Sequence, residues 1–244
     1  MLVNKYFRKI LFLFQFLLLS YLSLFCGENK SDCKEKPNPY NLEIISCIDD
    51  YDKQIAVNPN YKLIDLEKLI PNVVTDIRYA TKNNFTGKVI YTLPKAFLRL
   101  PVAEALLKVQ DSLSKLGLGL KIFDAYRPYA ATLKFYEVFP DTNFVANPRF
   151  GSRHNRGAAV DLTLINLTTK EELKMPSQFD DFSEKAHPDY MNLPEDVIKN
   201  RTLLFDIMSL YGFTHYPSEW WHFDYKDWKL YPILNLSFEE LMNN

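Results

Sequence analysis

Hydrophobic and polar positions divide the chain into three parts. Residues 10–25 are almost continuously apolar, and residues 26–60 are rich in Lys, Asp, Asn and Pro with weak periodicity. Residues 61–244 carry the periodic patterns of helices and strands that bury one face. The pattern therefore predicts one folded domain over residues 61–244, joined by a polar linker over residues 26–60 to a separate N-terminal segment over residues 1–25.

Helices and short strands are mixed within the domain, without a regular strand–helix–strand repeat. Leu106, Val109 and Leu113 recur at helical spacing, and Gly117 follows them as a C-terminal cap. The helices expected are 104–116, 128–139 and 194–211, and the strands expected are 73–81, 121–125, 158–164, 213–216 and 221–225. This order predicts an α+β fold, a single domain with a small, largely antiparallel sheet flanked by helices.

The N-terminal segment is typical of an export signal. Lys5, Arg8 and Lys9 precede an apolar run of 16 residues, which is shorter than the ~20 residues of a comfortable membrane span. An uncleaved membrane anchor is the alternative. Cys26 follows directly, where a bacterial lipoprotein carries its lipid, although Phe25 stands where a small residue is favoured. We expect an exported protein of the periplasm or cell envelope, with membrane contact only through this segment or a lipid on Cys26.

Cysteine and charge content change this picture only in part. Cys33 and Cys47 could form a disulfide in an exported protein, or they could be free thiols in the linker. Lys and Arg number 29 against 30 Asp and Glu, for a net charge of -1. A chain without a positive field has no means of holding the phosphates of nucleic acid, so nucleic acid is not an expected partner.

A candidate metal half-site lies around His154. Asp161 follows seven residues later between Val160 and Leu162, inside a predicted strand. A half-buried carboxylate is costly unless it is paired or binds a metal ion, and Gly157 lets the backbone turn sharply between the two residues. The alternative is a surface Asp on the solvent face of an edge strand.

A second half-site combines Glu219 and His222 beside two Trp residues. Zinc hydrolases pair a ligand imidazole with a Glu that takes a proton from the attacking water. The alternative is an aromatic edge strand with an incidental Glu and His. Together with His154 and Asp161, His222 would give three ligands and an open fourth position, which is the composition of a catalytic zinc site with one Zn²⁺ per chain. Two imidazoles are poor ligands for Mg²⁺ or Ca²⁺.

Arg127 lies at a predicted strand-to-helix junction, where a fixed guanidinium could stabilise an oxyanion. The alternative is a solvated Arg or a structural ion pair with Asp124. His187, in an acidic loop, and His215, before a Tyr-Pro turn, are not expected to be ligands.

Taken in order, these segments carry a family resemblance. The pattern S-x-H-x-x-G-x-A-x-D, from Ser152 to Asp161, followed by E-W-W-H from Glu219, is similar to the zinc signature of bacterial D,D-carboxypeptidases and D,D-dipeptidases. The chain most resembles the VanX-type D-alanyl-D-alanine dipeptidases over residues 65–225. The other segments that carry the resemblance are Tyr79–Thr81, Asn84–Gly87, Asp124–Pro128 and Phe179–Asp180.

The resemblance implies a zinc site at the sheet and the hydrolysis of free D-alanyl-D-alanine to two D-alanine in the cell envelope. It implies that His154, Asp161 and His222 bind the zinc ion, that Glu219 is the general base, and that Arg127 stabilises the oxyanion. It further implies that Asp180 and Tyr79 bind the ammonium group of the substrate and that Ser152 binds its carboxylate. A pocket closed at both ends would restrict such an enzyme to the small free dipeptide.

The chain also departs from this family. Arg153 stands where a small residue is common, Ala125 replaces a usual Gly, and the export signal is unlike the cytoplasmic enzymes of vancomycin resistance. In an envelope compartment, the dipeptide would come from wall turnover. One alternative is a zinc D,D- or L,D-carboxypeptidase that trims peptidoglycan stem peptides. Another is a non-enzymatic module that binds wall peptides, although binding alone does not need Glu219.

Overall fold

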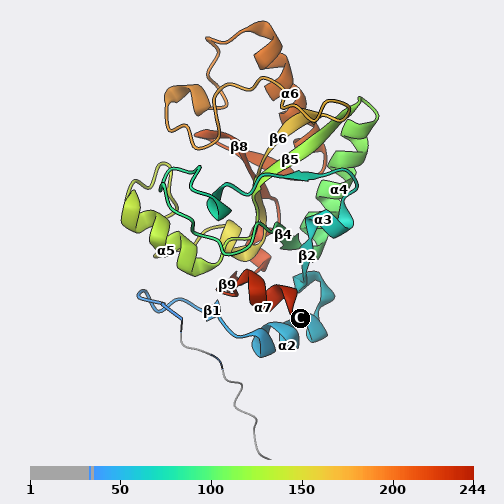
Figure 1. The fold of residues 1–244 in the computed structure, drawn as a ribbon. Helices are drawn as coiled ribbons and strands as arrows, with labels where there is room; N and C mark the ends of the chain where they lie inside the picture. Colours follow the sequence, from blue (N-terminus) through green and yellow to red (C-terminus); the bar gives the residue numbers. More distant parts are fainter. Residues whose placement is uncertain (1–32, 34–35) are drawn as a thin grey trace, which may run out of the picture. The chain divides into compact units, whose positions relative to one another are not determined.

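The computed structural model describes Cys33 and residues 36–244, and residues 34–244 form one compact unit (Figure 1). The predicted export signal and the lipidation site at Cys26 lie outside the described residues. Among the residues that are described, every helix is too short or too polar to cross a bilayer.

The elements follow one another as mixed helices and strands, as the α+β prediction requires. The strands are β1 (Ile44–Ile45), β2 (Leu63–Asp65), β3 (Val74–Thr75), β4 (Phe97–Arg99), β5 (Leu118–Asp124), β6 (Ala159–Asn166), β7 (Phe213–Tyr216), β8 (Glu219–Tyr225) and β9 (Ile233–Leu234). The α-helices are α2 (Ile48–Val57), α3 (Leu66–Leu69), α4 (Leu100–Ser114), α5 (Tyr129–Val138), α6 (Glu195–Leu210) and α7 (Phe238–Met242). The 3₁₀ turns are η1 (Pro59–Tyr61), η2 (Arg78–Ala80), η3 (His154–Arg156), η4 (Glu184–Ala186) and η5 (Trp228–Leu230).

Strand β6 is the centre of the main sheet, whose strand order is β3-β5-β6-β8-β7. The pair β3–β5 is parallel, and the pairs β5–β6, β6–β8 and β7–β8 are antiparallel. Every residue of β6 except Asn166 is buried, so the strand is covered on both faces. The predicted fold of a small, largely antiparallel sheet is confirmed, and Asp161 does not lie on the solvent face of an edge strand.

Helices cover the sheet from two sides. In Figure 1, α4 and α5 lie on opposite sides of β5, and α6 contacts both α4 and β7. Helix α4 begins at Leu100, four residues before the predicted start, because Pro101 fits the first turn, where no backbone N–H is needed. Its buried residues Leu106, Val109 and Leu113 form the predicted apolar stripe.

Several predicted strand boundaries are also wrong, including that of β5, which begins at Leu118 rather than at Lys121. The strand expected over residues 73–81 is β3 alone, because the chain turns into η2 after the Asp76 N–H donates to the Ile122 carbonyl. That turn buries Tyr79 in the interior. The strand expected to begin at Trp221 begins at Glu219 instead.

The stretch assigned to a polar linker is partly folded. Strand β1 pairs in parallel with β9 near the C-terminus, and Figure 1 shows β1 and α2 beside β9 and α7. In α2, Tyr51 is buried and its hydroxyl accepts a hydrogen bond from the Leu63 N–H. The helix was not predicted because α2 is mostly polar and acidic and buries only Tyr51 fully. Cys33 and Cys47 are both disulfide-bonded, which decides between the two alternatives for these residues.

Candidate active site and metal centre

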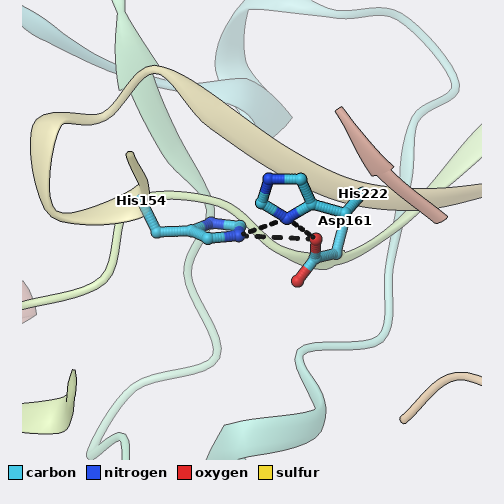
Figure 2. A group of neighbouring side chains, drawn as sticks. All are labelled: His154, Asp161 and His222. Carbon is cyan, nitrogen blue, oxygen red and sulfur yellow. Dashed lines mark hydrogen bonds and ion pairs between the residues drawn. The ribbon is translucent and has the colours of Figure 1, made fainter. Parts of the chain in front are cut away.

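Three side chains from different elements meet at the sheet (Figure 2). Asp161 on β6 and His222 on β8 are direct partners across an antiparallel pair, so their side chains emerge side by side. His154 reaches them from η3, and all three residues are buried. The structure thus brings together the three residues that the sequence predicts as metal ligands.

The distances within this cluster fit a zinc ion. His222 Nδ1 lies 2.9 Å from Asp161 Oδ1 and 3.1 Å from His154 Nε2, and His154 Nε2 lies 3.4 Å from Asp161 Oδ1. Tetrahedral zinc with bonds of ~2.0–2.1 Å separates its ligand atoms by roughly 3.3 Å. Two imidazoles and one carboxylate are also a donor set that zinc accepts readily.

Glycine and main-chain contacts place His154. Gly157 closes η3 at a φ of 65°, and a Cβ there would lie 2.6 Å from the Leu63 side chain. His154 Nδ1 lies 2.7 Å from the Ala125 carbonyl, which can only accept a hydrogen bond. The ring proton is therefore on Nδ1, and the lone pair of Nε2 faces the other two ligands.

An irregularity in the β7–β8 pair brings Glu219 to the cluster. His215 pairs with Phe223 but the next residue, Tyr216, pairs with Glu219, so β8 bulges between these points. Without the bulge, residues three apart would face opposite sides of the strand. Glu219 Oε2 lies 3.8 Å from His222 Nδ1, and burial raises the pKa of Glu219 to about 8.

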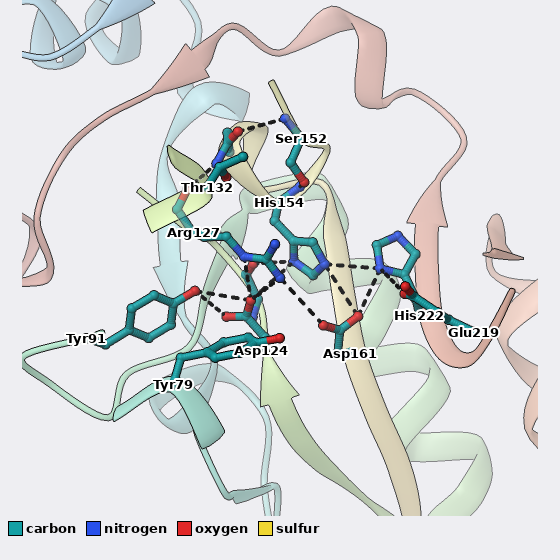
Figure 3. A network of polar contacts seen from close by, with 12 residues as sticks. Tyr79, Tyr91, Asp124, Arg127, Thr132, Ser152, His154, Asp161, Glu219 and His222 are labelled. Atoms are coloured by element: carbon teal, nitrogen blue, oxygen red, sulfur yellow. Dashed lines mark hydrogen bonds and ion pairs between the residues drawn. The ribbon is translucent and has the colours of Figure 1, made fainter. Parts of the chain in front are cut away.

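Arg127 forms an ion pair with Asp124 and also faces the cluster (Figure 3). Its Nε and Nη2 donate to Asp124 Oδ2 at 3.0 and 2.8 Å, and Nη2 lies 3.9 Å from Asp161 Oδ2. The Tyr91 hydroxyl and the Ala125 N–H also donate to Asp124. The two interpretations of Arg127 are therefore compatible, because the ion pair fixes a guanidinium that lines the cavity.

Asp180 and Tyr79 lie together although 101 residues separate them in the sequence. The Tyr79 hydroxyl donates to Asp180 Oδ1 at 3.0 Å. Among the described residues, no donor lies within hydrogen-bonding distance and angle of the buried Asp180 Oδ2, and the Phe85 N–H contributes only a lowering effect on the pKa of the carboxyl group. Burial, followed by the nearby charge of Asp161, raises the pKa of Asp180 to about 7. The pair leaves one buried acceptor available to a ligand.

Ser152 makes two hydrogen bonds within its own loop. Its Oγ accepts a hydrogen bond from the His154 N–H at 3.2 Å, and its own N–H donates to Asn155 Oδ1 at 2.7 Å. These bonds hold the first turn of η3. Within the described part of the chain the Ser152 hydroxyl donates no hydrogen bond to a protein group, and it lines the cavity.

One cavity of about 460 Å³ connects all of the predicted site residues. They are Tyr79, Arg127, Ser152, His154, Asp161, Asp180, Glu219 and His222. Aromatic side chains form much of the remaining wall, including Phe135, Trp221 and Trp228. Among the described residues, His187 and His215 lie outside the cluster of His154, Asp161 and His222.

Comparison with known proteins gives the family. A family model described as D-Ala-D-Ala dipeptidase, Peptidase_M15, matches residues 59–240. The chain belongs to this family. The D-alanyl-D-alanine dipeptidase of Escherichia coli (strain K12) is 36% identical over 173 residues, which cover 71% of this chain and 89% of that protein. The D-alanyl-D-alanine dipeptidase of Enterococcus faecium is 32% identical over 182 residues, which cover 66% of this chain and 90% of that protein.

Solved structures also match this chain, at lower similarity. The vancomycin resistance D,D-dipeptidase VanXYg, solved in complex with a D-Ala-D-Ala phosphinate analogue, matches with a TM-score of 0.34 and 19% identity. The match covers 68% of this chain and 66% of that one.

Two further polar residues, Tyr91 and Asp224, support the site, although they were not predicted from the sequence. Tyr91 donates to Asp124 and so supports Arg127, but no local pattern marks it. Asp224 contacts His222, and its signal was available because residues two apart on a strand share a face.

Proposed function

We propose that this chain hydrolyses free D-alanyl-D-alanine to two molecules of D-alanine, with one zinc ion as cofactor. The observation that supports the proposal most is that one cavity contains both a metal-binding cluster and a buried carboxylate that could bind an ammonium group. The cluster is that of His154, Asp161 and His222, and the carboxylate is that of Asp180, whose buried Oδ2 is unpartnered among the described residues. The relatives at 32–36% identity that carry the name D-alanyl-D-alanine dipeptidase support it.

Charged and polar groups at the cavity wall suit the two ends of a free dipeptide. Asp180, held by Tyr79, would accept a charge-assisted hydrogen bond from the substrate ammonium. The Ser152 hydroxyl would donate to the substrate carboxylate. The scissile carbonyl would then lie near Arg127, whose guanidinium is already fixed by Asp124 and needs no rearrangement to stabilise an oxyanion.

Proton transfer falls to Glu219. A zinc ion held by His154, Asp161 and His222 would supply a Lewis acid that polarises the scissile carbonyl and lowers the pKa of the attacking water. Glu219 accepts the proton of that water and passes it to the leaving amine. Burial raises the pKa of Glu219 to about 8 in the metal-free chain, and the positive charge of a bound zinc ion would lower it again, toward a carboxylate that can accept a proton near neutral pH.

A carboxypeptidase acting on stem peptides is the alternative on the same scaffold. Such a substrate has an amide where the dipeptide has an ammonium. It would leave the Asp180 carboxylate buried without a positive partner. The cavity wall at Asp180 and Tyr79 therefore favours the dipeptidase. A module that only binds wall peptides would have no use for the buried Glu219.

We place the enzyme in the cell envelope, either free or held there by its N-terminal segment or by a lipid on Cys26. The basic and apolar N-terminal sequence supports export. The disulfide bonding of Cys33 and Cys47 supports an oxidising compartment. D-Ala-D-Ala released by wall turnover would be the substrate there.

Metal removal and restoration tests the proposed reaction. The purified chain, freed of metal by a chelator, should release no D-alanine from D-Ala-D-Ala, and one equivalent of zinc per chain should restore the release. A His222→Ala variant lacks one ligand and should not be restored. A metal-free chain that retains full activity would overturn the proposal.

A further inference from the structure

The second nitrogen of His222 points away from the metal cluster and has a partner of its own (Figure 2). Asp224 lies two residues further along β8, and its Oδ1 is 3.1 Å from His222 Nε2. An ionised carboxylate only accepts hydrogen bonds, so this contact places the ring proton on Nε2. The lone pair of Nδ1 is then the one that faces Asp161 and His154.

The two histidines of the cluster are therefore oriented by different means. His154 donates to the Ala125 main-chain carbonyl, which no substitution removes. His222 depends on the side chain of one residue. Metal ligands of this kind commonly owe their tautomer and ring orientation to such an outer carboxylate.

Arg153 fixes Asp224 in turn. Its Nε lies 3.3 Å from Asp224 Oδ2, and its guanidinium carbon lies 4.9 Å from the centre of the Trp228 ring and 5.6 Å from that of Tyr216. Arg153 also immediately precedes His154. The Arg153–Asp224 pair consequently ties the turn that carries one ligand to the strand that carries another.

We propose that Asp224 and Arg153 are positioning residues of the metal centre. Asp224 holds the proton of His222 on Nε2, and Arg153 holds Asp224 while joining η3 to β8. The inference rests on the proposed zinc site, and it assigns a role to Arg153, the residue that stands where the family commonly has a small one. Removing outer partners of this kind typically costs about 10–100-fold in metal affinity.

The test is zinc affinity, measured by competition with a chelator of known affinity and without any substrate. Asp224→Ala should weaken zinc binding by about 10–100-fold. Asp224→Asn should lose less, because its amide oxygen can still accept the hydrogen bond from Nε2. Arg153→Gln should also bind zinc more weakly than the unaltered chain. Asp227→Asn removes an exposed carboxylate three residues away and is the matched control, with unchanged affinity.

Thermal unfolding of the metal-free variants shows whether each one folds. If Asp224→Ala does not fold, Asp224→Asn and Arg153→Gln decide the question. Affinities equal to that of the unaltered chain in all folded variants would overturn the positioning roles. A change in KM alone, with unchanged zinc affinity, would make Arg153 a substrate contact and would also overturn its positioning role. Failure of the unaltered chain to bind zinc would instead contradict the proposed function.

Discussion

At the scale of single residues, the proposed mechanism assigns the proton transfer to Glu219. Replacing it by Gln keeps the shape of the side chain and removes the basic oxygen. Because Glu219 is not one of the three ligands, the variant should retain its zinc, while kcat falls by at least ~10²–10⁴-fold. Elemental analysis and steady-state kinetics on D-Ala-D-Ala measure the two effects separately.

Glu171→Gln, which changes an exposed residue, is the control for this substitution and should leave both quantities unaltered. If Glu219→Gln turned over substrate at the rate of the unaltered chain, Glu219 would be a structural residue.

Asp180 links substrate binding to the pH dependence of stability. Its pKa is about 7 in the folded chain and 3.8 as its ordinary value. Between roughly pH 4 and pH 7, Asp180 keeps a proton in the folded state that it has lost in the unfolded state. The contribution of Asp180 to the free energy of unfolding therefore falls as the pH rises. Asp180→Asn cannot ionise and escapes this loss. In the metal-free protein, its Tm relative to the unaltered chain should rise from pH 5 to pH 8.

Thermal unfolding of both proteins across this range measures the effect. A difference in Tm that stays constant from pH 5 to pH 8 would contradict the assigned cause, which is the burial of the Asp180 carboxylate.

At the scale of elements, the turn η3 decides where His154 lies. Gly157→Ala places a side chain at a φ of 65° and a Cβ 2.6 Å from Leu63. The left-handed conformation costs about 1–2 kcal/mol, and the overpacking adds about 1–3 kcal/mol. Gly87→Ala is the matched control, because its φ is 66° and no atom lies within 4 Å of the added Cβ. Only Gly157→Ala should also lose zinc affinity, which chelator competition measures beside denaturant unfolding.

Equal losses of stability in the two glycine variants, with zinc affinity retained in both, would show that η3 tolerates the added methyl group. The fit of the turn against Leu63 would then not be what places His154.

Elements with a clear local signal could be predicted from the sequence. Pro194 precedes helix α6, and Gly212 lies between α6 and strand β7. Proline restricts φ and glycine permits a positive φ in any protein, so both boundaries can be read from the sequence. The bulge in β8 could not be predicted, because it depends on how β7 and β6 pair with the two sides of that strand. The short β3 could not be predicted either, because the chain turns away from β5 into η2 soon after Thr75.

At the scale of the whole molecule, the site gathers residues from segments far apart in the chain. The motifs around His154 and Glu219 could be found in the sequence, and their resemblance to a known family assigned roles to Arg127 and Asp180. The partner that supports Arg127 could not be found, because Tyr91 approaches Asp124 only once the sheet and its loops are formed. Asp224 is different, because it lies two residues from His222 on the same face of β8 and its spacing could have indicated the contact. The stretch predicted as a polar linker shows the same limit as Tyr91, since α2 joins the core through the buried Tyr51 and the partly buried Ile48 and Ile55.

The central claim is that the cavity takes a free dipeptide by its ammonium group. The most direct measurement compares kcat/KM for D-Ala-D-Ala and for N-acetyl-D-Ala-D-Ala on the zinc-loaded chain. Loss of one partner of a buried charge pair costs ~3–5 kcal/mol, which is two decades or more in rate at ~1.4 kcal/mol per decade. The free dipeptide should therefore be cleaved at least about a hundredfold faster. Comparable rates on the two substrates would contradict this account, remove Asp180 from the site and favour a carboxypeptidase.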